Sequence, residues 1–129
     1  MSNQVSNKEH PIVREAAAVA AQPVAKSTGA HIRVLLGPED GMPRFYMREF
    51  TLEPGGRIPA HSHDAIEHEQ YVVAGELTIS LDGELRTAVA GRCIYIPAGC
   101  AHWYENRGAT DCRFLCMIPA GIAYSTDWL

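Results

Sequence analysis

From Ala30 onward, turn-forming residues divide the sequence into short runs in which apolar and polar side chains alternate. Runs rich in Val, Ile, Thr and aromatic residues with this period of two are typical of β-strands. Almost no segment shows the period of 3.6 residues that a helix requires. We expect strands at residues 31–36, 44–52, 68–74, 77–81, 86–90, 92–97, 101–107 and 112–119. Short strands at such regular spacing predict an all-β sandwich or barrel.

The segments between the strands carry turn signals. Asp82-Gly83 lies between two alternating runs, which is a strong indication of a β-hairpin. Residues 53–60, with two prolines and two glycines, predict a turn. Residues 14–21 could form two helical turns, although isolated helices of this length are marginal. We therefore expect an N-terminal arm over residues 1–29 and a single β-domain over residues 30–129.

Composition excludes several classes of protein. At 129 residues and 47% hydrophobic content, the chain has the make-up of one globular domain. A net charge of −4 and the lack of a basic stripe argue against nucleic-acid binding. No segment is long enough to span a membrane, and the polar first ten residues make a poor signal peptide. We expect a cytoplasmic protein.

The four cysteines show no zinc-finger spacing, since Cys112-x-x-x-Cys116 has no second cysteine pair to complete it. In a cytoplasmic chain, buried free thiols are more common than disulfides or cysteine–metal sites. We expect the first of these.

Three of the six histidines lie within eight residues, at His61, His63 and His68. Residues i and i+2 of a strand face the same side, so His61 and His63 project together. His68 opens the next strand and can face the same point if that strand is the neighbour of the first. His102 is distant in sequence and begins a later strand. Burying unpaired imidazoles is costly, and a metal ion would remove that cost.

Two glycine- and histidine-containing motifs carry a family resemblance. Gly55, His61, His63, His68 and Gly75 have the spacing of the first motif of the cupins, with His68 where glutamate is usual. The second motif is matched at every spacing by Gly91, Pro97, Gly99, His102 and Asn106. The chain therefore resembles a cupin over roughly residues 30–119. The resemblance implies a double-stranded β-helix, or jelly-roll barrel, with a metal inside and often a homodimeric assembly.

Within this family the chain resembles the four-histidine single-domain branch. We expect His61, His63, His68 and His102 to bind one divalent metal, because Glu67 and Glu69 would point to the opposite face of the strand. Four neutral ligands leave the full charge on the metal, which favours stabilising an anion such as an enolate. This argument makes zinc the first choice of metal, with manganese, iron and nickel as alternatives. A closed tetrahedral site with a structural role remains an alternative.

Alternation also predicts which other side chains reach the interior. Phe50 and Leu52 form the natural core face of their strand, so Arg48 and Tyr46 should face inward too. An inward arginine needs a partner, which would be a substrate carboxylate or phenolate or a structural acid, unless a bulge turns the side chain outward. Gln70 shares the face of His68 and could orient a bound oxygen or water. We take Gln70, Arg48 and Tyr46 as candidate catalytic residues. Tyr104, Trp103 and Trp128 are expected to serve mainly in packing.

The finer resemblance is to the small cupins of actinobacterial aromatic polyketide pathways, among them the resistomycin-type cyclases. It rests on the segment HSHDAIEHEQYVVAGEL (61–77) and on the Ala-, Gly- and Arg-rich composition. It implies an enzyme that closes a ring in a poly-β-ketone by intramolecular aldol condensation and dehydration. One alternative is a cupin dioxygenase acting on a β-diketone or polyphenol. Another is a metal-dependent small-ligand-binding protein without catalytic activity.

Overall fold

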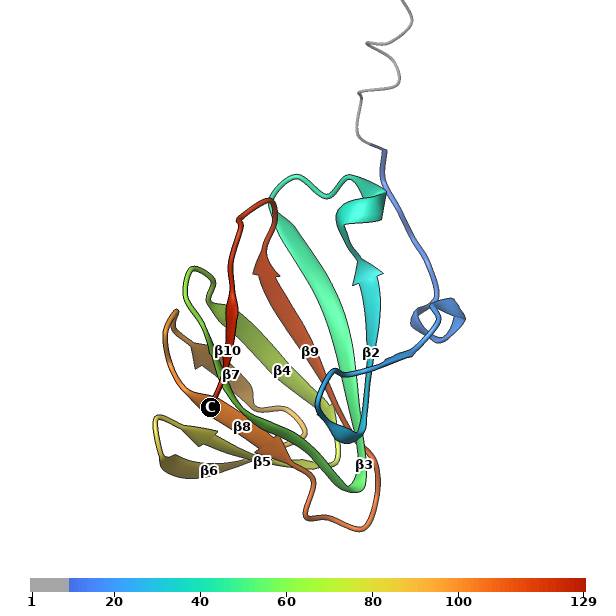
Figure 1. The fold of residues 1–129 in the computed structure, drawn as a ribbon. Helices are drawn as coiled ribbons and strands as arrows, with labels where there is room; N and C mark the ends of the chain where they lie inside the picture. Colours follow the sequence, from blue (N-terminus) through green and yellow to red (C-terminus); the bar gives the residue numbers. More distant parts are fainter. Residues whose placement is uncertain (1–9) are drawn as a thin grey trace, which may run out of the picture.

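The computed structural model describes residues 10–129, which form a β-barrel with antiparallel strand pairing throughout (Figure 1). Two short 3₁₀ turns, Ala16–Ala18 and Pro38–Asp40, are the helical elements of this part of the chain. The strands are β1 (Gln22–Pro23), β2 (Thr28–Leu36), β3 (Phe45–His63), β4 (His68–Ala74), β5 (Glu76–Leu81), β6 (Glu84–Val89), β7 (Cys93–Ile96), β8 (His102–Glu105), β9 (Cys112–Pro119) and β10 (Thr126–Trp128). The expected all-β jelly-roll barrel is confirmed.

Strand β3 pairs with four other strands and so connects two sides of the barrel. Its first half pairs with β2 and β9, and its second half pairs with β8 and β10. Figure 1 shows β3 running beside β2 and β9 and then bending toward β8 and β10. The main path of the sheet has the strand order β6-β5-β8-β3-β9-β4-β7, and β1, β2 and β10 lie off this path. One strand therefore supplies residues to both walls of the interior.

The turn predicted at residues 53–60 is wrong, because β3 continues through this segment. Gly55 has a φ of +81°, which permits a sharp bend. The bend keeps its backbone partners: Gly55 N–H donates to the Asn106 carbonyl at 2.9 Å, and Asn106 N–H donates to the Gly56 carbonyl at 2.9 Å. The glycines therefore bend the strand rather than end it.

The hairpin predicted at Asp82-Gly83 is confirmed. Leu81 pairs with Glu84 across a two-residue loop, and Asp82 and Gly83 have φ values of +50° and +85°. Positive φ at both loop positions is the geometry of a type I′ turn, whose twist matches that of the flanking strands.

An apolar core fills part of the barrel interior. Phe114 is fully buried, and its ring stacks on Phe50 at 5.2 Å and on Tyr104 at 5.1 Å between centroids. The buried Asn106 donates from Nδ2 to the carbonyls of Leu52 and Thr110, each at 2.8 Å. This motif asparagine therefore fastens the loop after β8 to the bend in β3.

Part of the predicted arm lies against the barrel, while residues 1–9 are outside the described residues. Strand β1 pairs with β2, placing Pro23 opposite His31. The Arg14 guanidinium donates to the Leu35 carbonyl at 3.0 Å and pairs with Asp40 at 2.9 Å. Residues 14–21 form a single 3₁₀ turn rather than two helical turns. The domain boundary at residue 29 stays a prediction.

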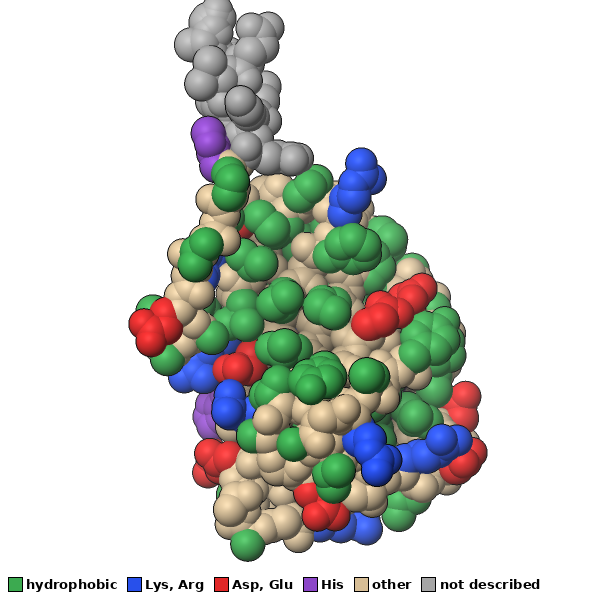
Figure 2. Space-filling view, turned by 180° about the vertical axis from the view of Figure 1, so that it is seen from behind, with side chains coloured by type: hydrophobic (Ala, Val, Ile, Leu, Met, Phe, Trp, Pro, Cys, Tyr) green, Lys and Arg blue, Asp and Glu red, His purple; other side chains and the backbone are tan. Residues whose placement is uncertain are grey.

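The surface agrees with the lack of a basic stripe in the sequence. Lys and Arg side chains are interspersed with Asp and Glu on the face shown in Figure 2, and histidine occupies little of it. Within residues 10–129, no helix has the length and apolar character needed to cross a bilayer. The absence of a nucleic-acid partner and the cytoplasmic location stay predictions.

All four cysteines are free thiols, as expected, but one is not buried. Cys93 is exposed on β7, whereas Cys100, Cys112 and Cys116 are buried. The short strand β7 turns the Cys93 side chain outward, which the sequence pattern did not reveal.

Candidate metal centre

Four histidines from three strands meet inside the barrel. His61 and His63 end β3, and His102 begins β8 as the direct cross-strand partner of His61. His68 begins β4, which is not a neighbour of β3 as the simplest prediction required. It reaches the other rings across the interior, with centroid distances of 5.0 Å to His63 and 5.3 Å to His102. The ring of His61 lies 4.2 Å from that of His102.

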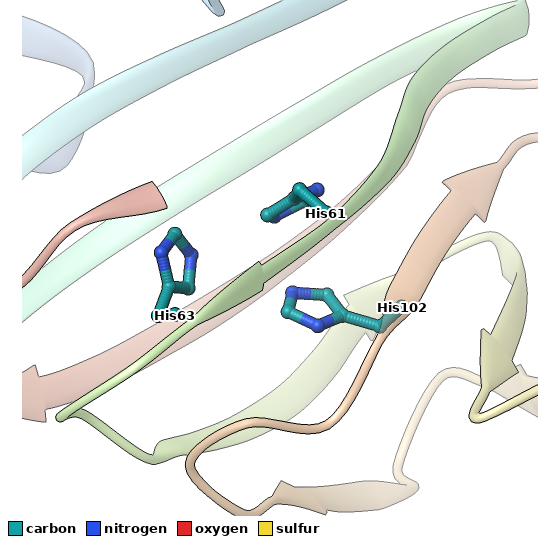
Figure 3. Close-up of side chains that lie close together, drawn as sticks. All are labelled: His61, His63 and His102. Carbon is teal, nitrogen blue, oxygen red and sulfur yellow. The ribbon is translucent and has the colours of Figure 1, made fainter. Parts of the chain in front are cut away.

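Three of these histidines offer donor atoms close enough to share one ion. The candidate ligand atoms of His61, His63 and His102 all lie within 4.8 Å of one another (Figure 3). Figure 3 shows the three rings converging from β3 and β8. His68 is buried beside this group, but it is not part of the 4.8 Å set.

Hydrogen bonds on the far side of each ring orient three of the imidazoles. Nδ1 of His61 donates to the Pro59 carbonyl at 2.8 Å, and Nδ1 of His102 donates to the Cys100 carbonyl at 2.9 Å. Nδ1 of His63 lies 3.0 Å from the Thr126 hydroxyl. A carbonyl can only accept, so it fixes the tautomer that leaves Nε2 with a free lone pair. This is the usual arrangement around metal-binding histidines.

Burial keeps the rings uncharged at neutral pH. Desolvation is the largest cause that lowers the pKa of His63 to about 4, and the charges of His61 and Arg48 act in the same direction. It also lowers the pKa of His102 to about 4 and, together with Arg48, that of His68 to about 2. The pKa of His61 is lowered for the same reason. Neutral imidazole is the form that binds a metal.

The residues present fit a metal ion. Nε2 of His102 is buried and has no hydrogen-bond partner within residues 10–129. A buried polar atom without a partner is costly, and a metal ligated at that nitrogen would remove the cost. The donor set of imidazole nitrogens suits zinc, copper, iron or nickel.

The histidines line a cavity of about 240 Å³. Arg48 and Gln70 line it as well, together with Phe50 and Tyr104. Arm residues Pro23, Val24 and Ala25 contribute another part of the lining. None of the lining residues is Asp or Glu, so the charged group facing this space, apart from the titratable histidines, is the arginine.

Two of the three candidate catalytic residues line the cavity, and the third does not. Arg48 and Gln70 reach the cavity, and Gln70 is only 4% exposed. Tyr46 does not line the cavity. It packs with Ile66 and Ile118, and its hydroxyl accepts a hydrogen bond from Gly121 N–H at 3.2 Å. Alternation predicted an inward side chain but not its packing against Ile66 and Ile118 away from the cavity.

Strand β10 supplies site residues that the sequence did not indicate. The Trp128 ring lies 4.9 Å from that of His61 and lines the cavity, as does Thr126. Tyr124, just before this strand, sits edge-on to His63 at 5.3 Å. Trp128, expected to serve mainly in packing, therefore also forms part of the cavity wall. Three residues are too few for a periodic signal, and only pairing with β3 brings them to the histidines.

The glutamates that flank His68 point away from the histidine cluster, in the direction that alternation predicted. Glu67 and Glu69 lie in a surface groove with Tyr46, Met47 and Met117. A hydrogen bond from Glu67, supported by burial and like charge, raises the pKa of Glu69 to about 7. These carboxyl groups are engaged with each other.

The chain is similar to known proteins both in sequence and in structure. The cupin domain family matches residues 48–118, which is more than half of the chain. The chain is 33% identical over 91 residues to the polyketide synthase CurC of Streptomyces cyaneus, covering 70% of this chain and 59% of CurC. It is 28% identical over 109 residues to the tetracenomycin polyketide synthase protein TcmJ of Streptomyces glaucescens, covering 82% and 73%.

Among solved structures, the polyketide cyclase RemF of Streptomyces resistomycificus superposes with a TM-score of 0.85 at 27% identity. That alignment covers 93% of this chain and 86% of RemF. The two motifs, the barrel and the buried histidines agree with the family match over residues 48–118. The chain belongs to the cupin family.

Proposed function

We propose that the protein is a metal-dependent polyketide cyclase. It would close a ring in a poly-β-ketone by forming a carbon–carbon bond between an enolate carbon and a ketone carbon, followed by loss of water. The observation that carries the proposal is the set of neutral, oriented histidines at a cavity. The likeness to RemF and to the polyketide synthase proteins CurC and TcmJ supports it.

His61, His63 and His102 would hold the metal, with His68 as the fourth ligand. Zinc is the first choice, because four neutral ligands leave its charge undiminished and the chemistry needs no change of oxidation state. When bound, a divalent ion polarises carbonyl oxygens and so acidifies the carbon between them. Manganese, iron and nickel are the alternatives.

The residues of the chain itself supply orientation and charge. Arg48 places a positive guanidinium at the cavity wall, where it would stabilise an enolate oxygen. The buried amide of Gln70 would orient a substrate oxygen or a water molecule. Phe50 and Trp128 provide aromatic walls that exclude water and hold the chain bent for ring closure. Tyr46 has no part in this proposal, since it lies outside the cavity.

Metal content and cyclisation test the proposal together. Protein purified without added metal is measured by inductively coupled plasma mass spectrometry, as wild type, His68→Ala and His102→Ala. His31→Ala is the matched control, because this histidine is half-exposed on β2 and lies outside the cavity. We expect about one zinc per chain in the wild type and control, a weakened site in His68→Ala, and loss of metal in His102→Ala.

Cyclisation of a poly-β-ketone is then followed before and after chelator treatment. Activity that disappears with the metal and returns with zinc agrees with the proposal, whereas full cyclisation by metal-free protein contradicts it. Stoichiometric iron, manganese or nickel with oxygen uptake would favour a dioxygenase. A tightly held ligand without turnover would favour a binding protein. The expected homodimer stays a prediction that light scattering can test.

A further inference from the structure

Three inward-facing side chains form one row across the wall made by β3, β9 and β4. Arg48 is the register partner of Cys116, and Cys116 is the register partner of Gln70. All three line the cavity that the histidines also line. The neighbouring row of Phe50, Phe114 and Val72 is entirely apolar. The polar row is therefore a local feature of the cavity wall.

Arg48 and Gln70 contact the same sulfur atom. Nη2 of Arg48 donates to Sγ of Cys116 at 3.0 Å, and Nε2 of Gln70 donates to it at 3.3 Å. Nε2 of Gln70 also donates to the Tyr104 hydroxyl at 2.7 Å. A shared contact atom places the guanidinium and the amide side by side.

Both side chains keep one buried polar atom without a partner. Nε of Arg48, a donor, and Oε1 of Gln70, an acceptor, have no hydrogen bond within the part of the chain that the structure describes. No carboxylate of residues 10–129 lies within ion-pair distance of Arg48. A half-buried guanidinium without a counter-ion is costly. The row therefore lacks one anion and one hydrogen-bond donor.

A single small ligand can supply both. A carboxylate matches the planar fork of a guanidinium better than a neutral oxygen does. An adjacent hydroxyl would donate to Oε1 of Gln70. The cavity of about 240 Å³ is smaller than the roughly 300–1,000 Å³ of sites for drug-sized ligands, so it has room for only one end of a long chain.

We propose that Arg48 and Gln70 form a subsite for a carboxylate that carries a neighbouring hydroxyl or enol group. Applied to the proposed cyclase function, on which this naming of the substrate rests, the subsite selects the free, enolised β-keto acid end of a poly-β-ketone. It places that end beside the histidines and leaves the rest of the chain toward the cavity mouth.

Salicylate is a stable probe that carries both the carboxylate and the neighbouring hydroxyl. Salicylamide lacks the charge, and 2-methoxybenzoate lacks the hydroxyl donor. Dissociation constants are measured by calorimetry on the metal-containing protein as wild type, Arg48→Gln, Arg48→Lys and Gln70→Met. Arg57→Gln is the matched control, because this arginine lies on the same strand, is exposed and stacks on Trp103 outside the cavity.

We expect the wild type to prefer salicylate over both analogues. Arg48→Gln should reduce the preference over salicylamide by roughly tenfold or more, as expected for loss of a charge-assisted hydrogen bond. Arg48→Lys should keep part of that preference, and Arg57→Gln all of it. Gln70→Met should reduce the preference over 2-methoxybenzoate while leaving the preference over salicylamide.

An unchanged salicylate-to-salicylamide ratio in Arg48→Gln would overturn the proposal, since another group, such as the metal, would then hold the carboxylate. Equal wild-type binding of salicylate and 2-methoxybenzoate would refute the role of Gln70. Should Arg48→Gln fail to fold, Arg48→Lys and Gln70→Met decide the same questions. No turnover is needed, so an Arg48-dependent preference in a protein that does not cyclise poly-β-ketones would refute the cyclase function alone.

Discussion

Replacing Thr126 with valine would remove the hydroxyl beside Nδ1 of His63 while keeping the shape of the side chain. The hydroxyl lies 3.0 Å from that nitrogen and orients the ring. Removing such a partner of a metal-binding histidine typically weakens metal binding by about 10–100-fold. The backbone of Ser125 also interacts with His63. We therefore expect zinc binding to weaken by an amount at the low end of this range, about tenfold, or about 1.4 kcal/mol.

Competition between the protein and a chromophoric chelator for zinc would measure this change. Thr87→Val on the exposed strand β6 is the matched control and should bind zinc as the wild type does. Urea unfolding of the metal-free Thr126→Val protein should show a loss of about 1 kcal/mol or less, because one partly buried neutral hydrogen bond is removed. Wild-type zinc affinity in Thr126→Val would refute the orienting role of the hydroxyl. A loss of several kcal/mol in the metal-free protein would show that β10 acts mainly on stability.

Three further predictions concern stability. In metal-depleted protein the pKa values of His63 and His102 are lowered to about 4 in the folded state, so the unfolded chain, with values of about 6.5, binds more protons between these limits. The free energy of unfolding should therefore fall as the pH is lowered from about 6.5 to about 4, and a pH-independent urea midpoint would contradict this. Asn106→Ala removes a buried side chain that donates to two carbonyls and accepts from one backbone N–H, and should cost about 2–4 kcal/mol in urea unfolding. Gly75→Ala should destabilise the protein more than Gly99→Ala, as compared by thermal unfolding. Both have positive φ, but a Cβ at Gly75 would lie 2.5 Å from a backbone oxygen, whereas Gly99 faces open space. Equal losses would show that backbone strain alone sets the cost.

Local signals predicted the strands whose side chains alternate and whose ends are marked by turn residues. The hairpin at Asp82-Gly83 is one case, since its turn chemistry is contained in two residues. The bend at Gly55-Gly56 is the opposite case. A turn and a bend use the same glycines and prolines, and only the partners on β8 and β9 decide that the strand continues.

The candidate site also has residues that the sequence predicted and residues that it did not. Motif spacing predicted which histidines come together, and alternation predicted that Arg48 and Gln70 face the interior. The contributions of Thr126 and Trp128 could not be predicted, because they arise from pairing between β10 and β3 rather than from any local pattern. Tyr46 packs against Ile66 and Ile118 and lines a surface groove instead of the cavity, which alternation along one strand could not predict.

The pairing of His61 with His102 has a consequence for how the barrel folds. The two residues are direct partners in the β3–β8 register, although about forty positions separate them in the sequence. Such distant pairing forms slowly and can slip, and a slip of one residue turns every side chain of a strand to the other face. A slipped barrel would turn one imidazole outward and lose the ligand pair. A metal that binds both rings would thus stabilise only the native register. Its binding free energy would increase the free-energy difference between the correctly paired barrel and a misaligned one.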